Sequence, residues 1–190
     1  MPQLGQNKID IFEPSYKDIN IGGPILAVIP GQQPDRDEFV DSLGSDTGIS
    51  TYAIAIGEGV EGNFELQHDY EEGTDLIFHV HWQGIAAPTG TDNVKWQLTY
   101  TVSRNGSVLA SASTITVEST FDTQYQFVIS SFSAISGTTY KFGDQFLFKL
   151  ERVAADGDAY AGDALIATLG VHYKVDTLGS AQITNKYSLS

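Results

Sequence analysis

Residues 93–104 read NVKWQLTYTVSR and alternate strictly between apolar and polar side chains. The apolar set is Val94, Trp96, Leu98, Tyr100 and Val102. A period of two is the pattern of a β-strand with one face buried and the other toward solvent. Asn105-Gly106 follows directly, and this pair is a strong hairpin signal because both central residues of a type I′ turn need a positive φ. The stretch therefore predicts a half-buried strand that turns back into a second strand at residues 107–117.

Similar short runs occur along most of the chain. They predict further strands at residues 50–57, 64–68, 75–82, 123–132, 145–153 and 164–175, separated by Gly, Asp, Ser and Thr turns. Residues 34–43 (PDRDEFVDSL) differ, because early acidic residues and Asp35 in a capping position predict one short helix. About eight strands in one chain of this size predict an all-β fold, an antiparallel β-sandwich of the jelly-roll type with at most one short helix.

The first 32 residues are interrupted by Gly22-Gly23-Pro24 and Pro30-Gly31, which break any regular element. We expect residues 1–32 to form an extended N-terminal arm that crosses the body or reaches a neighbouring subunit. The remaining residues, 33–190, are expected to form a single sandwich domain, since a chain of 190 residues supports one large core.

The charge balance limits the partners. Ten Lys and Arg stand against 24 Asp and Glu, for a formal net charge of -14, which disfavours nucleic acid and anionic membranes. Cysteine is absent, so disulfides and cysteine nucleophiles are excluded. The longest apolar run, residues 24–30, is too short to span a bilayer, and the N-terminus lacks an apolar signal core. We therefore expect a soluble protein made without a cleaved signal.

Acidic residues crowd into one segment in which Arg36 is the sole basic residue. They are Asp35, Asp37, Glu38, Asp41, Asp46, Glu58, Glu61, Glu65, Asp69, Glu71, Glu72 and Asp75. This crowding predicts one strongly negative face or loop system.

Two histidines stand one residue apart in residues 73–82 (GTDLIFHVHW). Because Leu76, Phe78, Val80 and Trp82 would form the core face of this strand, His79 and His81 share the opposite face. Two imidazoles on one face can bind the same metal ion, but a catalytic site needs at least three protein ligands. His68 is our candidate for the third ligand, with His172 or Asp69 as alternatives. The competing interpretation is a polar strand face or subunit contact that has no cofactor.

Gly73, five residues and then His-x-His also match the opening of the motif of cupins, metal-binding jelly rolls that include dioxygenases and isomerases. The glutamate that the cupin motif places shortly after the second histidine is missing from residues 82–88. A cupin-like metalloenzyme is therefore the weakest of the interpretations, and we expect no enzyme activity.

Two further groups could bind ligands. Asp156, Asp158 and Asp163 could supply oxygen ligands to calcium, although a plain hairpin turn explains the first two equally well. Four aromatic residues could form a sugar-stacking platform if exposed, but their alternation with polar residues favours the core. They are Trp82, Trp96, Tyr100 and Tyr125.

Three stretches share a pattern with a known group of proteins. They are residues 67–82 (QHDYEEGTDLIFHVHW), residues 94–100 (VKWQLTY) and residues 172–180 (HYKVDTLGS), followed by Lys186. Together they resemble virion-associated structural proteins of tailed bacteriophages and prophages, over roughly residues 60–186. The chain departs from that pattern at Gln67, where proline is usual, and at Ala181-Gln182, where a basic residue is usual.

The resemblance implies a virion structural protein with no catalytic residues. We expect a homotrimer that decorates the head or belongs to the tail apparatus, binds other virion proteins and is assembled in the host bacterial cytoplasm. A trimer is expected because jelly-roll virion proteins often close around a threefold axis, which would bring His79 and His81 of three chains together. The alternative is a receptor- or carbohydrate-binding tail protein.

Overall fold

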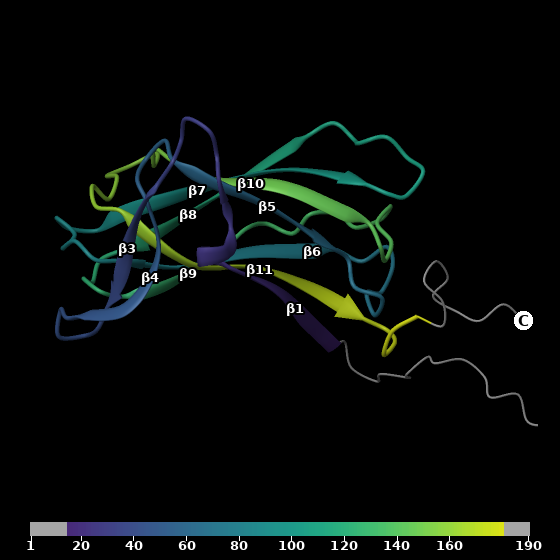
Figure 1. Ribbon diagram of the computed structural model, residues 1–190, viewed down its shortest axis with the longest axis horizontal. Coiled ribbons are helices and arrows are strands. Elements are labelled where there is room, and N and C mark those ends of the chain that lie inside the picture. Colours follow the sequence, from purple (N-terminus) through teal and green to yellow (C-terminus); the bar gives the residue numbers. More distant parts are fainter. Residues whose placement is uncertain (1–14, 181–190) are drawn as a thin grey trace, which may run out of the picture.

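The computed structural model describes residues 15–180, which form two antiparallel β-sheets packed face to face (Figure 1). The elements are β1 (Ser15–Gly22), the 3₁₀ turn η1 (Gly23–Ile25), β2 (Ala27–Val28), β3 (Asp35–Val40), β4 (Asp46–Ile54), β5 (Gly59–Glu65), β6 (Leu76–Gly84), β7 (Asp92–Ser103), β8 (Ser113–Phe121), β9 (Phe127–Ser131), β10 (Gln145–Val153) and β11 (Ala164–Val175). The prediction of an all-β sandwich is therefore confirmed. No helix long and apolar enough to cross a membrane occurs among these residues.

The strands pair in a nested order. β4 pairs with β11, β5 with β10, β6 with β9 and β7 with β8, as though one long hairpin had been rolled up into two layers. One sheet has the order β3-β4-β11-β6-β9, with β1 added along β11, and the other has the order β2-β5-β10-β7-β8. This nesting is the topology of a jelly roll.

The helix predicted for residues 34–43 is wrong, because Asp35–Val40 is strand β3 and pairs with β4. The acidic residues of this segment serve a hairpin instead of a helix cap. The Asp41 carboxylate accepts hydrogen bonds from the backbone N–H groups of Leu43 (2.8 Å) and Ser45 (2.9 Å), which close the turn between β3 and β4. These hydrogen bonds lower the pKa of Asp41.

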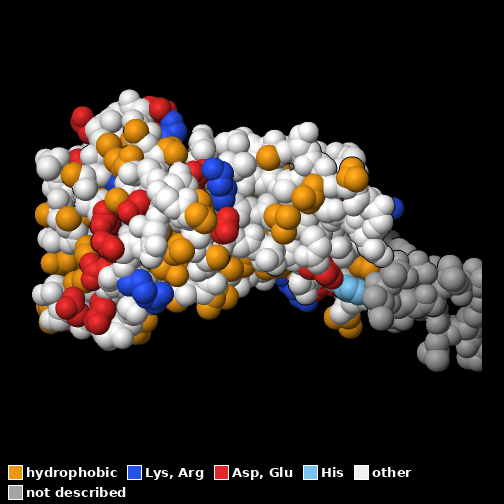
Figure 2. All heavy atoms as spheres, turned by 45° about the horizontal axis from the view of Figure 1, so that its top comes forward, with side chains coloured by type: hydrophobic (Ala, Val, Ile, Leu, Met, Phe, Trp, Pro, Cys, Tyr) orange, Lys and Arg blue, Asp and Glu red, His pale blue; other side chains and the backbone are white. Residues whose placement is uncertain are grey.

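Only part of the acidic segment gathers in one place. Several of its residues lie at the β3–β4 end of the sandwich, where Figure 2 shows Asp and Glu side chains gathered, whereas Asp69 and Glu71 lie in the turn before β6. Asp35, Asp37, Asp41 and Asp46 are all exposed there.

The type I′ hairpin predicted at Asn105-Gly106 is also wrong in detail. Gly106 has a φ of 82°, but Asn105 does not share the left-handed conformation that a type I′ turn requires at both positions. The chain does turn here, since the Ser107 N–H donates to the Arg104 carbonyl (2.9 Å). Residues 107–112 then form a loop, and the return strand β8 begins at Ser113, opposite Tyr100.

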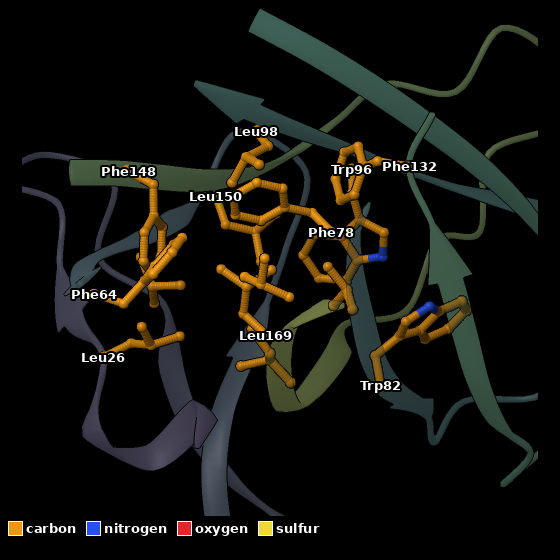
Figure 3. Packing of buried hydrophobic residues seen from close by; sticks show 14 of the residues in the cluster. Leu26, Phe64, Phe78, Trp82, Trp96, Leu98, Phe132, Phe148, Leu150 and Leu169 are labelled. Atoms are coloured by element: carbon orange, nitrogen blue, oxygen red, sulfur yellow. The ribbon is translucent and has the colours of Figure 1, made fainter. Parts of the chain in front are cut away.

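The core between the sheets is filled by the apolar faces that the alternation predicts. Trp82 of β6 and Trp96 of β7 are fully buried, with ring centroids 6.4 Å apart (Figure 3). Phe64 stacks on Phe146 at 4.9 Å, and Leu150 and Leu169 also lie in this layer. Because both tryptophans are buried, they cannot form a sugar-stacking platform at the surface.

Part of the expected N-terminal arm belongs to the sandwich. β1 is extended, as expected, and pairs with β11 from Ser15–Val175 to Gly22–Thr168. β2 then crosses to the other sheet and pairs with β5. Residues 1–14 of the expected arm lie outside the described residues.

A buried cation connects β10 to the rest of the sandwich. Arg152 is almost inaccessible to solvent, and its guanidinium donates hydrogen bonds to the carbonyls of Ile54 (3.0 Å), Gly162 (2.5 Å) and Tyr160. The guanidinium carbon also lies 5.4 Å from the centroid of the Tyr160 ring. These contacts join the end of β4 to the loop between β10 and β11.

Arg152→Met should lower the free energy of unfolding by about 3 kcal/mol, because a buried acceptor without a donor costs about 1–3 kcal/mol. The measurement is urea unfolding at equilibrium. Arg36→Met is the control, because Arg36 also donates to a backbone carbonyl and lies over a tyrosine ring but is exposed on β3. An equal loss of stability in both variants would contradict the proposed role of Arg152.

Candidate functional site

A cluster of histidines lies on the outer face of the six-stranded sheet. His79 and His81 come from β6, where they alternate with the fully buried Phe78, Val80 and Trp82. The predicted placement of both histidines on the face opposite the core is therefore confirmed. His172 comes from the neighbouring strand β11, and Asp18 from β1 lies directly opposite His172 in the β1–β11 ladder. Three adjacent strands thus each contribute to the cluster.

The four side chains lie close together. The ring centroid of His79 is 4.6 Å from that of His172 and 5.0 Å from that of His81. Nδ1 of His172 is 2.9 Å from Oδ1 of Asp18. One possible ligand atom from each of Asp18, His79 and His172 lies within 4.8 Å of the other two. Asp18 and His172 are exposed, whereas His79 is buried.

A glycine in the neighbouring strand makes room for His79. Gly170 lies opposite His79 in the β6–β11 ladder, and a Cβ atom at Gly170 would lie only 2.2 Å from Nε2 of His79. The imidazole therefore packs against the backbone of β11 at Gly170 and is only 4% exposed. Burial, together with the nearby His172, lowers the pKa of His79, so its imidazole is neutral at pH 7 and offers nitrogen lone pairs.

His68, our candidate for a third ligand, lies elsewhere. It follows β5, packs against Phe142 with ring centroids 4.9 Å apart, and contacts the hydroxyl of Ser180. The structure therefore does not bring His68 to His79 and His81, and His172 with Asp18 lies there instead. His172 was one of the alternatives, but no sequence pattern indicated Asp18, because its position depends on the pairing of β1 with β11.

The three aspartates considered for calcium are not gathered into one site. The Asp156 carboxylate accepts a hydrogen bond from Lys95, and the backbone carbonyl of Asp158 accepts one from the Asn93 N–H. Asp163 lies near Arg152, and burial raises its pKa. Within residues 15–180, the group formed by Asp18, His79 and His172 is the one set of three or more His, Asp or Glu close enough to share a metal ion.

A second polar cluster joins two stretches that are about a hundred residues apart in sequence. Residues 68–75, which form the turn before β6, lie against residues 172–180 at the end of β11. The Glu71 N–H donates to the Lys174 carbonyl (2.8 Å), and the Asp176 N–H donates to the Asp69 carbonyl (3.2 Å). The side chains of Glu71 and Lys174 also form an ion pair at 2.8 Å.

Asp69 is the buried centre of this second cluster. Its carboxylate accepts hydrogen bonds from the hydroxyl of Tyr173 (2.9 Å) and from the ammonium of Lys17 on β1. Burial, with the nearby carboxylate, raises the pKa of Tyr173, so its hydroxyl stays protonated and continues to donate. We call residues 68–75 and 172–180, joined in this way, the motif clamp.

No protein-family model matches the chain, and no curated protein sequence matches it. The chemistry of the site is therefore inferred from its geometry. The histidine cluster offers imidazole and carboxylate ligands at the protein surface, and the polar groups of the motif clamp are engaged with one another.

Gly170→Ala should displace the His79 ring and lower the free energy of unfolding by about 1–3 kcal/mol, the usual cost of overpacking. In NMR titrations the pKa of His79 should rise toward its usual value as the ring becomes exposed. Gly22→Ala is the control, because it lies on the outer face of the same sheet and its added Cβ would meet nothing closer than 3.9 Å. Equal behaviour of the two variants would contradict the close packing of His79 on Gly170.

Proposed function

We propose that this protein is a structural component of a tailed-bacteriophage virion and acts by binding other proteins. The observation that carries the proposal is the motif clamp. Residues 68–75 lie within the first of the three stretches that resemble virion-associated proteins, and residues 172–180 are the third. The two are bound to each other at one end of the sandwich. Glu71 pairs with Lys174 and Asp69 accepts a hydrogen bond from Tyr173, and such contacts between the two stretches are expected of a motif that maintains the fold.

A second feature supports a binding role. Phe127 and Ile129 of β9 are 51% and 57% exposed, and they lie on the same outer face as His81, while Ile77 lies farther along β6 on this face, beyond His79. The ring of His81 is 6.1 Å from that of Phe127. Exposed apolar side chains grouped on one face are typical of surfaces that contact another protein. We call Ile77, Phe127 and Ile129 the apolar strip.

In this proposal the apolar strip is buried when the protein assembles, as a homotrimer or against another virion protein of the head or tail. The acidic β3–β4 end would favour a partner with a basic surface. The apolar strip and the acidic β3–β4 end would act by binding alone. For this the jelly roll needs only to present a rigid outer surface. Assembly would take place in the cytoplasm of the host bacterium before the protein is exposed on the particle.

The proposal is tested by purifying phage particles from the producing strain on a density gradient and quantifying the chain by mass spectrometry. We expect a constant number of copies per particle across the particle peak. A chain that is abundant in the lysate but absent from the particle peak would contradict a virion role.

The same preparation tests the apolar strip. Replacing both Phe127 and Ile129 with serine should reduce incorporation into particles at least tenfold. A tenfold loss corresponds to about 1.4 kcal/mol of binding free energy, and both residues would lose apolar contact area with the partner. Leu147→Ser is the control, since Leu147 is 40% exposed on β10 of the other sheet. Incorporation that falls equally in both variants would argue against the apolar strip as the contact surface.

A further inference from the structure

The geometry points to a divalent transition-metal site formed by Asp18, His79 and His172 on the outer face of the six-stranded sheet. This inference concerns a ligand of the single chain and does not depend on the virion role. It also differs from the predicted set of His79, His81 and His68, because Asp18 of β1 and His172 of β11 take the places of His81 and His68. Two imidazoles and one carboxylate are a ligand set suited to zinc and other first-row metals.

The donors already lie near the separation that a metal requires. Their ligand atoms lie within 4.8 Å of one another, whereas tetrahedral zinc with bonds of about 2.1 Å holds its ligands about 3.4 Å apart. Asp18 and His172 are exposed, so their side chains can close this gap by small rotations. His79 is held in place by packing and needs to move least.

The buried imidazole of His79 supplies an independent indication of a ligand. His79 is 4% exposed, and its Nδ1 atom has no hydrogen-bond partner. The Ile77 carbonyl is close enough to influence the pKa of His79, but it makes no hydrogen bond of normal geometry with Nδ1. A buried polar atom without a partner is costly, and a metal ion bound to Nδ1 would offset that cost.

The surroundings of the three residues also suit a metal. Gly170 is the residue in β11 that lets the His79 ring lie against the sheet, since any larger residue would collide with Nε2. Oδ1 of Asp18 lies 2.9 Å from Nδ1 of His172, so the side chains of these two ligands already reach each other across the β1–β11 ladder. Gly170 and Asp18 lie on neighbouring strands, so the register of the sheet fixes their positions relative to His79 and His172.

A metal bound here would connect β1 to β6 across β11. β1 lies at the edge of the sheet and is paired on one side only. The ion would therefore act as a staple that holds the N-terminal strand on the body, and it would raise the melting temperature by binding only the folded chain. This role is purely structural and requires no chemical reaction at the metal.

The test uses the full-length protein without a histidine tag, stripped with EDTA and dialysed to equilibrium against zinc chloride. Zinc content is measured by mass spectrometry and stability by thermal unfolding. We expect about one zinc per chain and a rise in melting temperature on zinc addition. Asp18→Asn and His172→Ala should each weaken zinc binding by at least roughly 10–100-fold. That is the loss seen when a residue that only supports a metal ligand is replaced, and a direct ligand should matter at least as much.

His68→Ala is the control, because His68 lies outside the cluster and should leave zinc binding unchanged. Asp18→Asn should remain folded, since the substitution keeps the size of an exposed side chain, and circular dichroism can check this. A loss of zinc binding in this variant then reports the loss of a ligand and not unfolding. The inference is overturned if the wild-type chain binds no stoichiometric zinc, or if Asp18→Asn and His172→Ala bind it as tightly as the wild type. One zinc per three chains would also overturn it, because the ion would then lie between subunits.

Discussion

Strand β11 has two edges, and the way these edges are covered determines most of the structure. Along one edge β11 pairs with β6 from Ala164 to Tyr173. The other edge is divided, because β4 covers only Ala164 and Leu165, while β1 covers Thr168 to Val175. Without β1 most of this edge would expose unpaired backbone groups, which invite pairing with another chain. The N-terminal strand therefore completes the sheet.

β1 also connects the two polar clusters. Lys17 reaches the buried Asp69 of the motif clamp, and its neighbour Asp18 reaches His172 in the histidine cluster. Because side chains alternate along a strand, two consecutive residues of β1 serve opposite faces of one sheet. The motif clamp and the inferred metal site thus both depend on β1 and β11, although Lys17 and Asp18 lie on different faces of the sheet.

Much of the fold could be predicted from the sequence, but the candidate site could not. Strands β10 and β11 begin and end at the residues that the alternation predicts, because their apolar faces fill the core. The prediction for residues 34–43 was wrong because acidic residues and a capping aspartate suit a hairpin turn as well as a helix. His79 and His81 could be placed on one face by alternation alone. His172 could be named only as an alternative to His68, and Asp18 could not be named at all, because cross-strand register depends on the whole sheet.

β1 pairs with β11 of its own chain, and amide hydrogen exchange measured by NMR can test this pairing. We predict that the β1 amides bonded to β11 exchange much more slowly than the amides of the exposed loop at residues 104–112. This protection should persist when the protein is diluted. β1 amides that exchange as fast as the loop would contradict the account. Protection that disappears on dilution would also contradict it, because β1 would then be paired with a neighbouring chain.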